Sequence, residues 1–149
     1  MLTVDLNTAP GRAIRTIASN DCYELLYNEV ENRIYLTVNG FWKSPAAVPE
    51  YLHDWEKALL LSKVNFTLLA DFRGMITHPQ ELNSLHIAVL KLVKAHGLLQ
   101  FACVAPDDKI ASLQVAAICE ESGIEPHIFS SPEDAHEFLN TSAASYQQV

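Results

Sequence analysis

Residues 65–71 read NFTLLAD and residues 72–85 read FRGMITHPQELNSL, so an apolar run that ends at an acid leads into a loop and then a helix. A continuous apolar run of this length is typical of a strand that is buried on both faces of a parallel sheet. From about Pro79 to His96 apolar residues recur at helical spacing, and Gly97 follows where a helix stop is expected. A strand joined to a helix in this way predicts an α/β fold.

The same alternation continues toward the C-terminus. Residues 98–104 (LLQFACV) predict a second buried strand, and a helix is expected from Pro106 to about Ser122. A short strand is expected over residues 125–129. Pro126 places it at the edge of the sheet, because proline lacks the amide hydrogen that an inner strand needs.

Two helix boundaries carry clear signals. Gly123 predicts the end of the helix that begins near residue 106. Ser131 predicts the N-cap of a last helix, with Pro132 at its first position and the acids Glu133 and Asp134 in its first turn.

Two strands precede the first helix. Residues 21–29 and 32–42 are rich in β-branched and aromatic residues, and the polar break between them predicts an antiparallel hairpin. A helix is expected over residues 46–62. The order ββαβαβαβα predicts a single α/β domain with a mixed, mostly parallel sheet of about five strands and about four helices.

Composition at the ends of the chain predicts three segments. Residues 1–20 contain the breaker pair Pro10-Gly11 and are expected to form an N-terminal arm with at most a short extended piece. Residues 21–140 hold the α/β domain, and residues 141–149 are expected to be a flexible tail.

Bulk properties exclude several classes of function. The chain has 149 residues and a formal charge of −8, from 18 acids against 10 bases, which disfavours nucleic acids and anionic membranes as partners. No apolar run is long enough to insert in a membrane, and the first ten residues show no signal peptide. Three cysteines without a CxxC pair predict buried, reduced thiols and a cytoplasmic location.

Ligands of parallel sheets bind beyond the carboxyl ends of the strands, which makes the loop after residue 71 the first candidate site. Asp71, Thr77 and His78 hold the residue types of a hydrolytic triad, but no GxSxG elbow accompanies them. No phosphate-binding glycine motif and no histidine spacing typical of a metal site occurs. We therefore expect no catalytic residues, no cofactor and no metal, and an enzyme is the last of three hypotheses.

Three stretches resemble the STAS-like family, the anti-sigma-factor-antagonist-like domains with their STAS/SEC14-like branch: NRIYLTVNGFWKSP (32–45), FTLLADFRGM (66–75) and KLVKAHGLLQFACVAP (91–106). The resemblance implies a non-catalytic regulatory domain. The family's phosphorylated serine would fall within Pro79–Leu82, where this chain has no hydroxyl. Lipid-binding relatives imply, as an alternative, a carrier of a small apolar ligand.

The leading hypothesis is therefore a domain that docks a partner protein through the loops at residues 71–81 and the neighbouring helix surface, with homodimerisation also expected. The residues expected to bind are Trp42, Asp71, Phe72, Arg73, Gly74, Met75, Thr77, His78, Gln80 and Glu81. In the alternative, a small apolar ligand or lipid would occupy a pocket lined by Trp42, Trp55, Phe72 and Met75.

Overall fold

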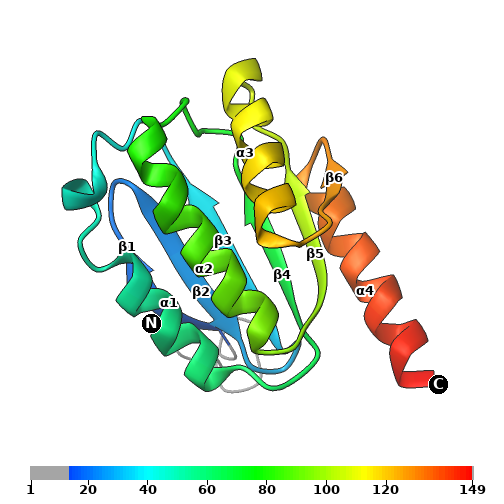
Figure 1. Cartoon of the computed structure of the whole chain (residues 1–149). Coiled ribbons are helices and arrows are strands. Elements are labelled where there is room, and N and C mark those ends of the chain that lie inside the picture. Colours follow the sequence, from blue (N-terminus) through cyan, green and yellow to red (C-terminus); the bar gives the residue numbers. More distant parts are fainter. Residues whose placement is uncertain (1–13, 149) are drawn as a thin grey trace, which may run out of the picture.

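The computed structural model describes residues 14–148, and the side chains of residues 14–141. The described residues form one six-stranded sheet in which the strands stand side by side in chain order, from β1 to β6. Helices pack on both faces of this sheet (Figure 1). The α/β class and the single mixed sheet are as the sequence predicts.

The sheet changes direction in its middle. Strands β1, β2 and β3 pair antiparallel, and β3 to β6 pair parallel. The bounds are β1 Ile14–Ser19, β2 Tyr23–Asn28, β3 Arg33–Val38, β4 Phe66–Asp71, β5 Leu98–Val104 and β6 His127–Phe129. The expectation of about five, mostly parallel strands is wrong in both respects, because a sixth strand adds a second antiparallel pair at the beginning of the sheet.

The additional strand lies in the segment that the sequence analysis assigned to an N-terminal arm. Ile14–Ser19 pairs with β2 and forms an edge of the sheet, with a register shift between Thr16 and Ala18. None of its six residues is buried, so it gives no apolar pattern. Residues 1–13 of the expected arm lie outside the described residues.

Four α-helices are described. They are α1 Tyr51–Leu61, α2 Asn83–Ala95, α3 Lys109–Ser122 and α4 Pro132–Gln148. Single 3-10 turns at Pro45–Ala47 and Gln80–Leu82 precede α1 and α2. Helix α4 continues through residues 141–148, which the sequence analysis placed in a flexible tail, while Val149 lies outside the described residues.

Most of the predicted helix boundaries are confirmed. Gly123 ends α3 in the left-handed conformation, with φ of 75°, and Gly97 follows α2 with φ of 93°. Ser131 Oγ accepts a hydrogen bond from the Asp134 amide at the start of α4. Helix α3 begins later than expected, because Asp108 is its N-cap.

Two apolar cores lie on opposite faces of the sheet. The larger core packs α1, α2 and α3 on strands β2 to β5, and its largest buried side chains include Trp42, Trp55, Tyr23, Tyr51 and Phe101. The smaller core packs Ala135 and Leu139 of α4 on Leu69, Ala102 and Val104. Helix α4 contacts β4, β5 and β6, so it covers only one half of its face of the sheet.

None of the described helices combines the length and apolar character that a membrane span requires. Of the three cysteines, Cys103 and Cys119 are buried and Cys22 is half-buried, and none is paired in a disulfide. Burial raises the pKa of the Cys119 thiol to about 11, and burial together with the neighbouring Cys119 raises that of Cys103. The two buried thiols are thus kept in their neutral, unreactive form.

Candidate functional site

The loops at the carboxyl ends of β3 and β4 are joined by backbone hydrogen bonds. The Gly40 amide donates to the carbonyl of Gly74 at 2.7 Å, and the Ile76 amide donates to the carbonyl of Gly40 at 3.0 Å. Gly40 and Met75 therefore form a parallel bridge beyond the ends of the named strands. This pairing extends the sheet by one residue pair and fixes the loop after Asp71 against the loop that carries Phe41 and Trp42.

Asp71 and Arg73 form a bidentate salt bridge. The two Asp71 carboxylate oxygens accept hydrogen bonds from Arg73 Nε at 3.0 Å and Nη2 at 2.8 Å, and Oδ1 also accepts from the Arg73 amide. Partial burial acts to raise the pKa of Asp71, but the bonds from Arg73 outweigh it and hold that pKa below its usual range. This carboxylate therefore holds the loop in place.

Thr77 is bound to α3. Asp108 Oδ2 accepts hydrogen bonds from both the amide and the hydroxyl of Thr77, each at 3.0 Å, while Asp108 Oδ1 accepts from the Ile110 and Ala111 amides of α3. These backbone and side-chain bonds lower the pKa of Asp108. One carboxylate thus caps a helix and ties the loop to it.

His78 is buried among aromatic side chains. Its ring lies 4.7 Å from the Trp42 indole, centroid to centroid and nearly parallel, and its Nδ1 lies 3.1 Å from Nε2 of His86 on α2. The Gln114 side chain bonds both the amide and the carbonyl of His78 at 2.9 Å. Desolvation lowers the pKa of both histidines; the neighbouring His78 lowers that of His86 further, while the hydrogen bond to the Gly40 carbonyl acts in the opposite direction on His78.

The three residues of the considered triad therefore have separate partners. Asp71 binds Arg73, Thr77 binds Asp108, and His78 binds His86 and Gly40. Among the described side chains, the Thr77 hydroxyl donates to Asp108 and not to His78, which is the base of the considered triad. That triad would need the nucleophile to be bonded to its base.

The predicted binding residues fall into two groups. Trp42, Met75 and His78 are buried and support the loops, and Phe72 is half-buried over the larger core. Arg73, Gly74, Gln80 and Glu81 are exposed, and Asp71 and Thr77 are half-buried. The predicted binding residues that face solvent are therefore mostly polar or charged.

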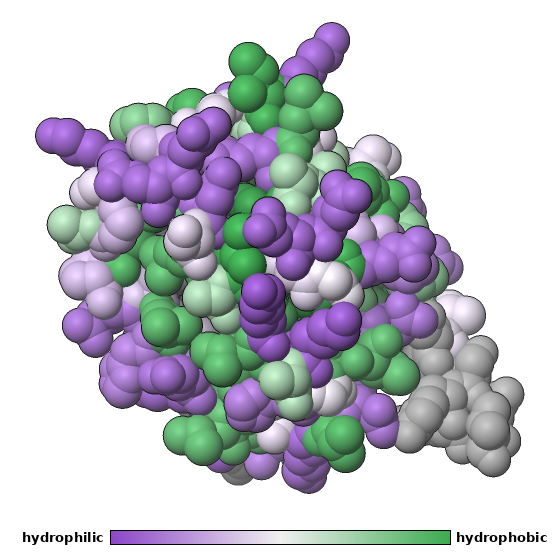
Figure 2. Space-filling model, viewed as in Figure 1, coloured by the Kyte–Doolittle hydropathy of each residue, from purple (hydrophilic) through white to green (hydrophobic). Residues whose placement is uncertain are grey.

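Sequence reasoning missed an apolar surface at the same end of the sheet. Phe41 and Ile76 follow the bridged residues Gly40 and Met75 on the two neighbouring loops, and their side chains are 54% and 52% exposed. On α3, Ile110 and Leu113 are 65% and 72% exposed. We call these four residues the apolar rim. Figure 2 shows apolar side chains gathered over the N-terminal end of α3. No sequence signal identified them, because an isoleucine in a loop or helix gives no indication of its exposure.

A narrow cavity, partly open to solvent, lies between the three helices and the sheet. Its volume is about 30 Å³, and it is lined mainly by apolar side chains. The lining includes Trp55 on α1, His86 on α2, and Phe72 and Met75 from the loop after β4. Trp55, Phe72 and Met75 are three of the four residues expected to line an apolar pocket, and Trp42 is outside it. The fully buried Trp55 Nε1 has no hydrogen-bond partner of good geometry, although the Tyr51 hydroxyl adjoins it.

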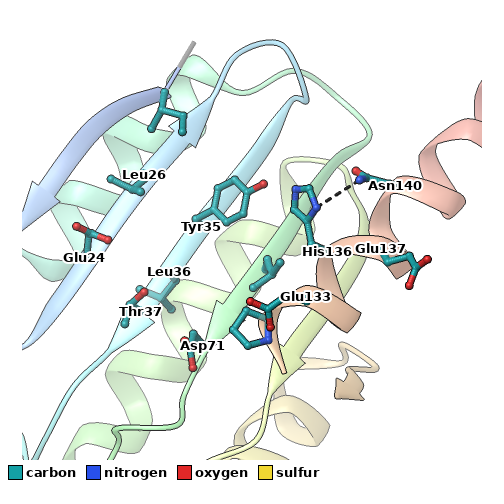
Figure 3. Close-up of a pocket in the computed structure, with 13 residues that line it drawn as sticks. Glu24, Leu26, Tyr35, Leu36, Thr37, Asp71, Glu133, His136, Glu137 and Asn140 are labelled. Atoms are coloured by element: carbon teal, nitrogen blue, oxygen red, sulfur yellow. Dashed lines mark hydrogen bonds between the residues drawn. The ribbon is translucent and has the colours of Figure 1, made fainter. Parts of the chain in front are cut away.

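A larger, open groove lies on the other face, between α4 and the part of the sheet that α4 leaves uncovered. Its volume is about 690 Å³, and its lining includes Leu26, Tyr35, Leu69 and His136. Figure 3 shows Tyr35 on β3 next to His136 on α4, and the two rings are stacked with their centroids 6.2 Å apart. Only one of its residues, Asp71, was among the predicted binding residues.

Among the described residues, no three His, Cys, Asp or Glu side chains are placed so that they could hold a metal ion together. Comparison of the chain with protein-family models, curated proteins and solved structures gave no match. The resemblance to the STAS-like family therefore stays a prediction from the three quoted stretches.

Proposed function

We propose that this chain is a non-catalytic binding domain, of the STAS-like kind that its sequence resembles, which docks a partner protein through the apolar rim. The observation that carries the proposal is the exposure of Phe41, Ile76, Ile110 and Leu113 at the carboxyl ends of the strands. Scattered apolar residues are common on protein surfaces, but a group rimmed by polar residues is typical of an interaction site.

The rim is rigidly supported, which favours binding because little order has to be gained on association. Phe41 and Ile76 stand on the backbone bridge between two loops. Ile110 lies in the first turn of α3, whose cap, Asp108, holds the loop at Thr77. Exposed polar residues of the same loop segment, among them Arg73 and Glu81, would supply the charged margin of the interface.

The proposal is tested by comparing partner capture from the native host. The double substitution Ile76→Ser/Ile110→Ser removes two rim side chains, and Val30→Ser/Leu60→Ser makes the same chemical change at positions that are 83% and 82% exposed elsewhere on the chain. Removing two anchors of an interface is expected to weaken binding at least about tenfold. A captured protein that binds both variants as it binds the wild type would contradict the proposal.

We also propose that the chain forms a homodimer through the same rim and that it is located in the cytoplasm. Light scattering of the wild type and of Ile76→Ser/Ile110→Ser at matched concentrations checks the dimer. A dimer that persists in the rim variant would require another contact surface.

The narrow cavity between the three helices and the sheet favours a second candidate function, the binding of a small apolar ligand. The lining is apolar, and the Trp55 indole offers one buried donor toward a polar atom of a guest. About 30 Å³ is room for a water molecule and not for a lipid, so a larger guest requires α2 and α3 to separate. Mass spectrometry of an organic extract of the purified protein tests it, with Trp55→Phe as the variant that keeps the ring and removes the donor.

A further inference from the structure

The open groove on the α4 side has an apolar floor and acidic walls. Leu26 and Leu69 lie among its lining residues, together with the ring of Tyr35, whereas the side chain of Leu36 packs in the larger core on the other face of the sheet. Its charged lining residues are Glu24 on β2, Asp71 on β4, and Glu133 and Glu137 on α4, and no lysine or arginine of the described chain lines it. Figure 3 shows these four acids distributed on both sides of the groove.

Three of these carboxylates are available to a guest. Asp71 is occupied by Arg73. Within the part of the chain that the structure describes, Glu24, Glu133 and Glu137 take part in no ion pair. A groove that places unpaired carboxylates around an apolar floor is complementary to a guest with cationic groups around an apolar centre.

The wall between α4 and β3 is held in place by Glu31. Its carboxylate accepts a hydrogen bond from the Tyr35 hydroxyl at 2.5 Å and lies 3.1 Å from Nε2 of His136 and 3.7 Å from the guanidinium of Arg33. Asn140 on α4 binds both His136 and Arg33. These contacts fix α4 relative to the sheet, so the groove exists before a guest arrives.

We infer that this groove binds a basic, extended segment of a partner protein, with an apolar side chain on the leucine floor and lysine or arginine side chains at Glu24, Glu133 and Glu137. The volume of about 690 Å³ lies in the range of ligand sites, and the groove is open along the uncovered strands, so a chain segment fits along it. This inference does not depend on the apolar rim, which lies elsewhere on the molecule.

Charge argues against the other occupants. A second copy of this chain carries the same formal charge of −8 and would be repelled by the acidic walls. The first thirteen residues carry one acid, Asp5, and one base, Arg12, and so offer little complementary charge.

The probe is a fluorescently labelled nine-residue peptide of alternating leucine and lysine, compared with the same peptide in which glutamate replaces lysine. Fluorescence anisotropy measures its affinity for the full chain. We expect micromolar binding of the lysine peptide, at least tenfold weaker binding of the glutamate peptide, and an affinity that falls with added salt. Amide chemical-shift changes on β2, β3 and α4 are expected to locate the bound peptide.

The matched variants are Glu133→Gln/Glu137→Gln on α4 and Glu120→Gln/Glu121→Gln on α3, which remove the same two charges from exposed positions on opposite faces of the sheet. The first pair is expected to weaken binding at least fivefold and the second less than twofold. Equal losses in both pairs would show attraction by net charge alone and overturn the inference. An unchanged affinity of Glu133→Gln/Glu137→Gln for the lysine peptide would also overturn the inference. Binding of spermine as tight as that of the peptide would do the same.

Discussion

His86 Nε2 lies 3.1 Å from His78 Nδ1, and His78 Nε2 lies 3.3 Å from the carbonyl oxygen of Gly40. A carbonyl only accepts, so His78 carries its proton on Nε2 and donates to Gly40. Its Nδ1 is then an acceptor, and His86 donates to it from Nε2. This chain of donors connects α2 to the loop bridge and requires the His78 ring to be neutral, so that its Nδ1 can accept.

The pair predicts that the protein loses stability in mild acid. Both pKa values are lowered below 6.5 in the folded state, chiefly by desolvation. Below about pH 6.5 the unfolded chain therefore binds more protons than the folded chain, and acid favours unfolding. Above that pH, the contribution of these two histidines to the free energy of unfolding is expected to stay constant. Below it, the free energy of unfolding is expected to fall by up to about 1.4 kcal/mol per pH unit for each histidine.

Urea unfolding between pH 7.5 and 5 measures this slope. His86→Leu removes one of the two groups and is expected to flatten the slope, while His53→Gln changes an exposed histidine on α1 and is expected to leave it unchanged. If the slope of His86→Leu equals that of the wild type, the histidine pair is not its source.

A second prediction concerns the buried Arg33, which is 1% exposed. Its guanidinium donates to Thr67 Oγ1 at 2.8 Å and Asn140 Oδ1 at 3.1 Å and lies beside Glu31. Arg33→Ala leaves these acceptors without their donor and is expected to lower the free energy of unfolding by about 3 kcal/mol. Arg15→Ala removes an exposed arginine that pairs with Glu29, and is expected to cost less than about 1 kcal/mol.

Chemical denaturation of both arginine variants at pH 7 checks the difference. Equal effects would mean that the buried arginine contributes no more than a surface ion pair. The position of Arg33 between β3, β4 and α4 would then be of no consequence for the seating of α4.

A third prediction compares two glycines with positive φ. A Cβ atom at Gly97 would lie 2.8 Å from Val64 Cγ2, whereas one at Gly40 would meet no atom within 4 Å. Alanine at either position is expected to cost about 1–2 kcal/mol for the left-handed backbone, and Gly97→Ala more than that because the side chains also overlap. Thermal unfolding of the two variants measures the difference, and an equal cost would show that Val64 moves aside freely.

The sequence predicts the strands and helices of the larger core well because they carry strong apolar patterns. Strand β4 is buried along five of its six residues, and β5 has the predicted bounds. Strand β1 was missed because an exposed edge strand needs no apolar side chains to pair its backbone. The beginning of α3 was placed too early because Asp107 and Asp108 both look like caps, and the bonds that Asp108 accepts from the Ile110 and Ala111 amides distinguish them only in the structure.

The candidate sites were harder to predict because each joins distant parts of the chain. His78 and His86 are eight residues apart, which along one helix would separate them by about 12 Å. They meet because a loop and a 3-10 turn lie between them. The groove brings Glu24 together with Glu133 and Glu137 from the opposite end of the chain. No local pattern records such pairs, since they depend on which strands α4 covers.

The last prediction separates the role of Asp108 from that of its neighbour. Asp108→Ala removes the cap of α3 and both bonds to Thr77, so the loop that carries Ile76 loses its tie to Ile110. We expect a lower midpoint of thermal unfolding and weaker binding of the rim's partner. Asp107→Ala removes the same charge at an exposed site and is expected to change neither. Differential scanning calorimetry and the partner-capture assay measure the two effects. Partner binding that survives in Asp108→Ala would mean that the two halves of the rim act independently, because the carboxylate is their shared anchor.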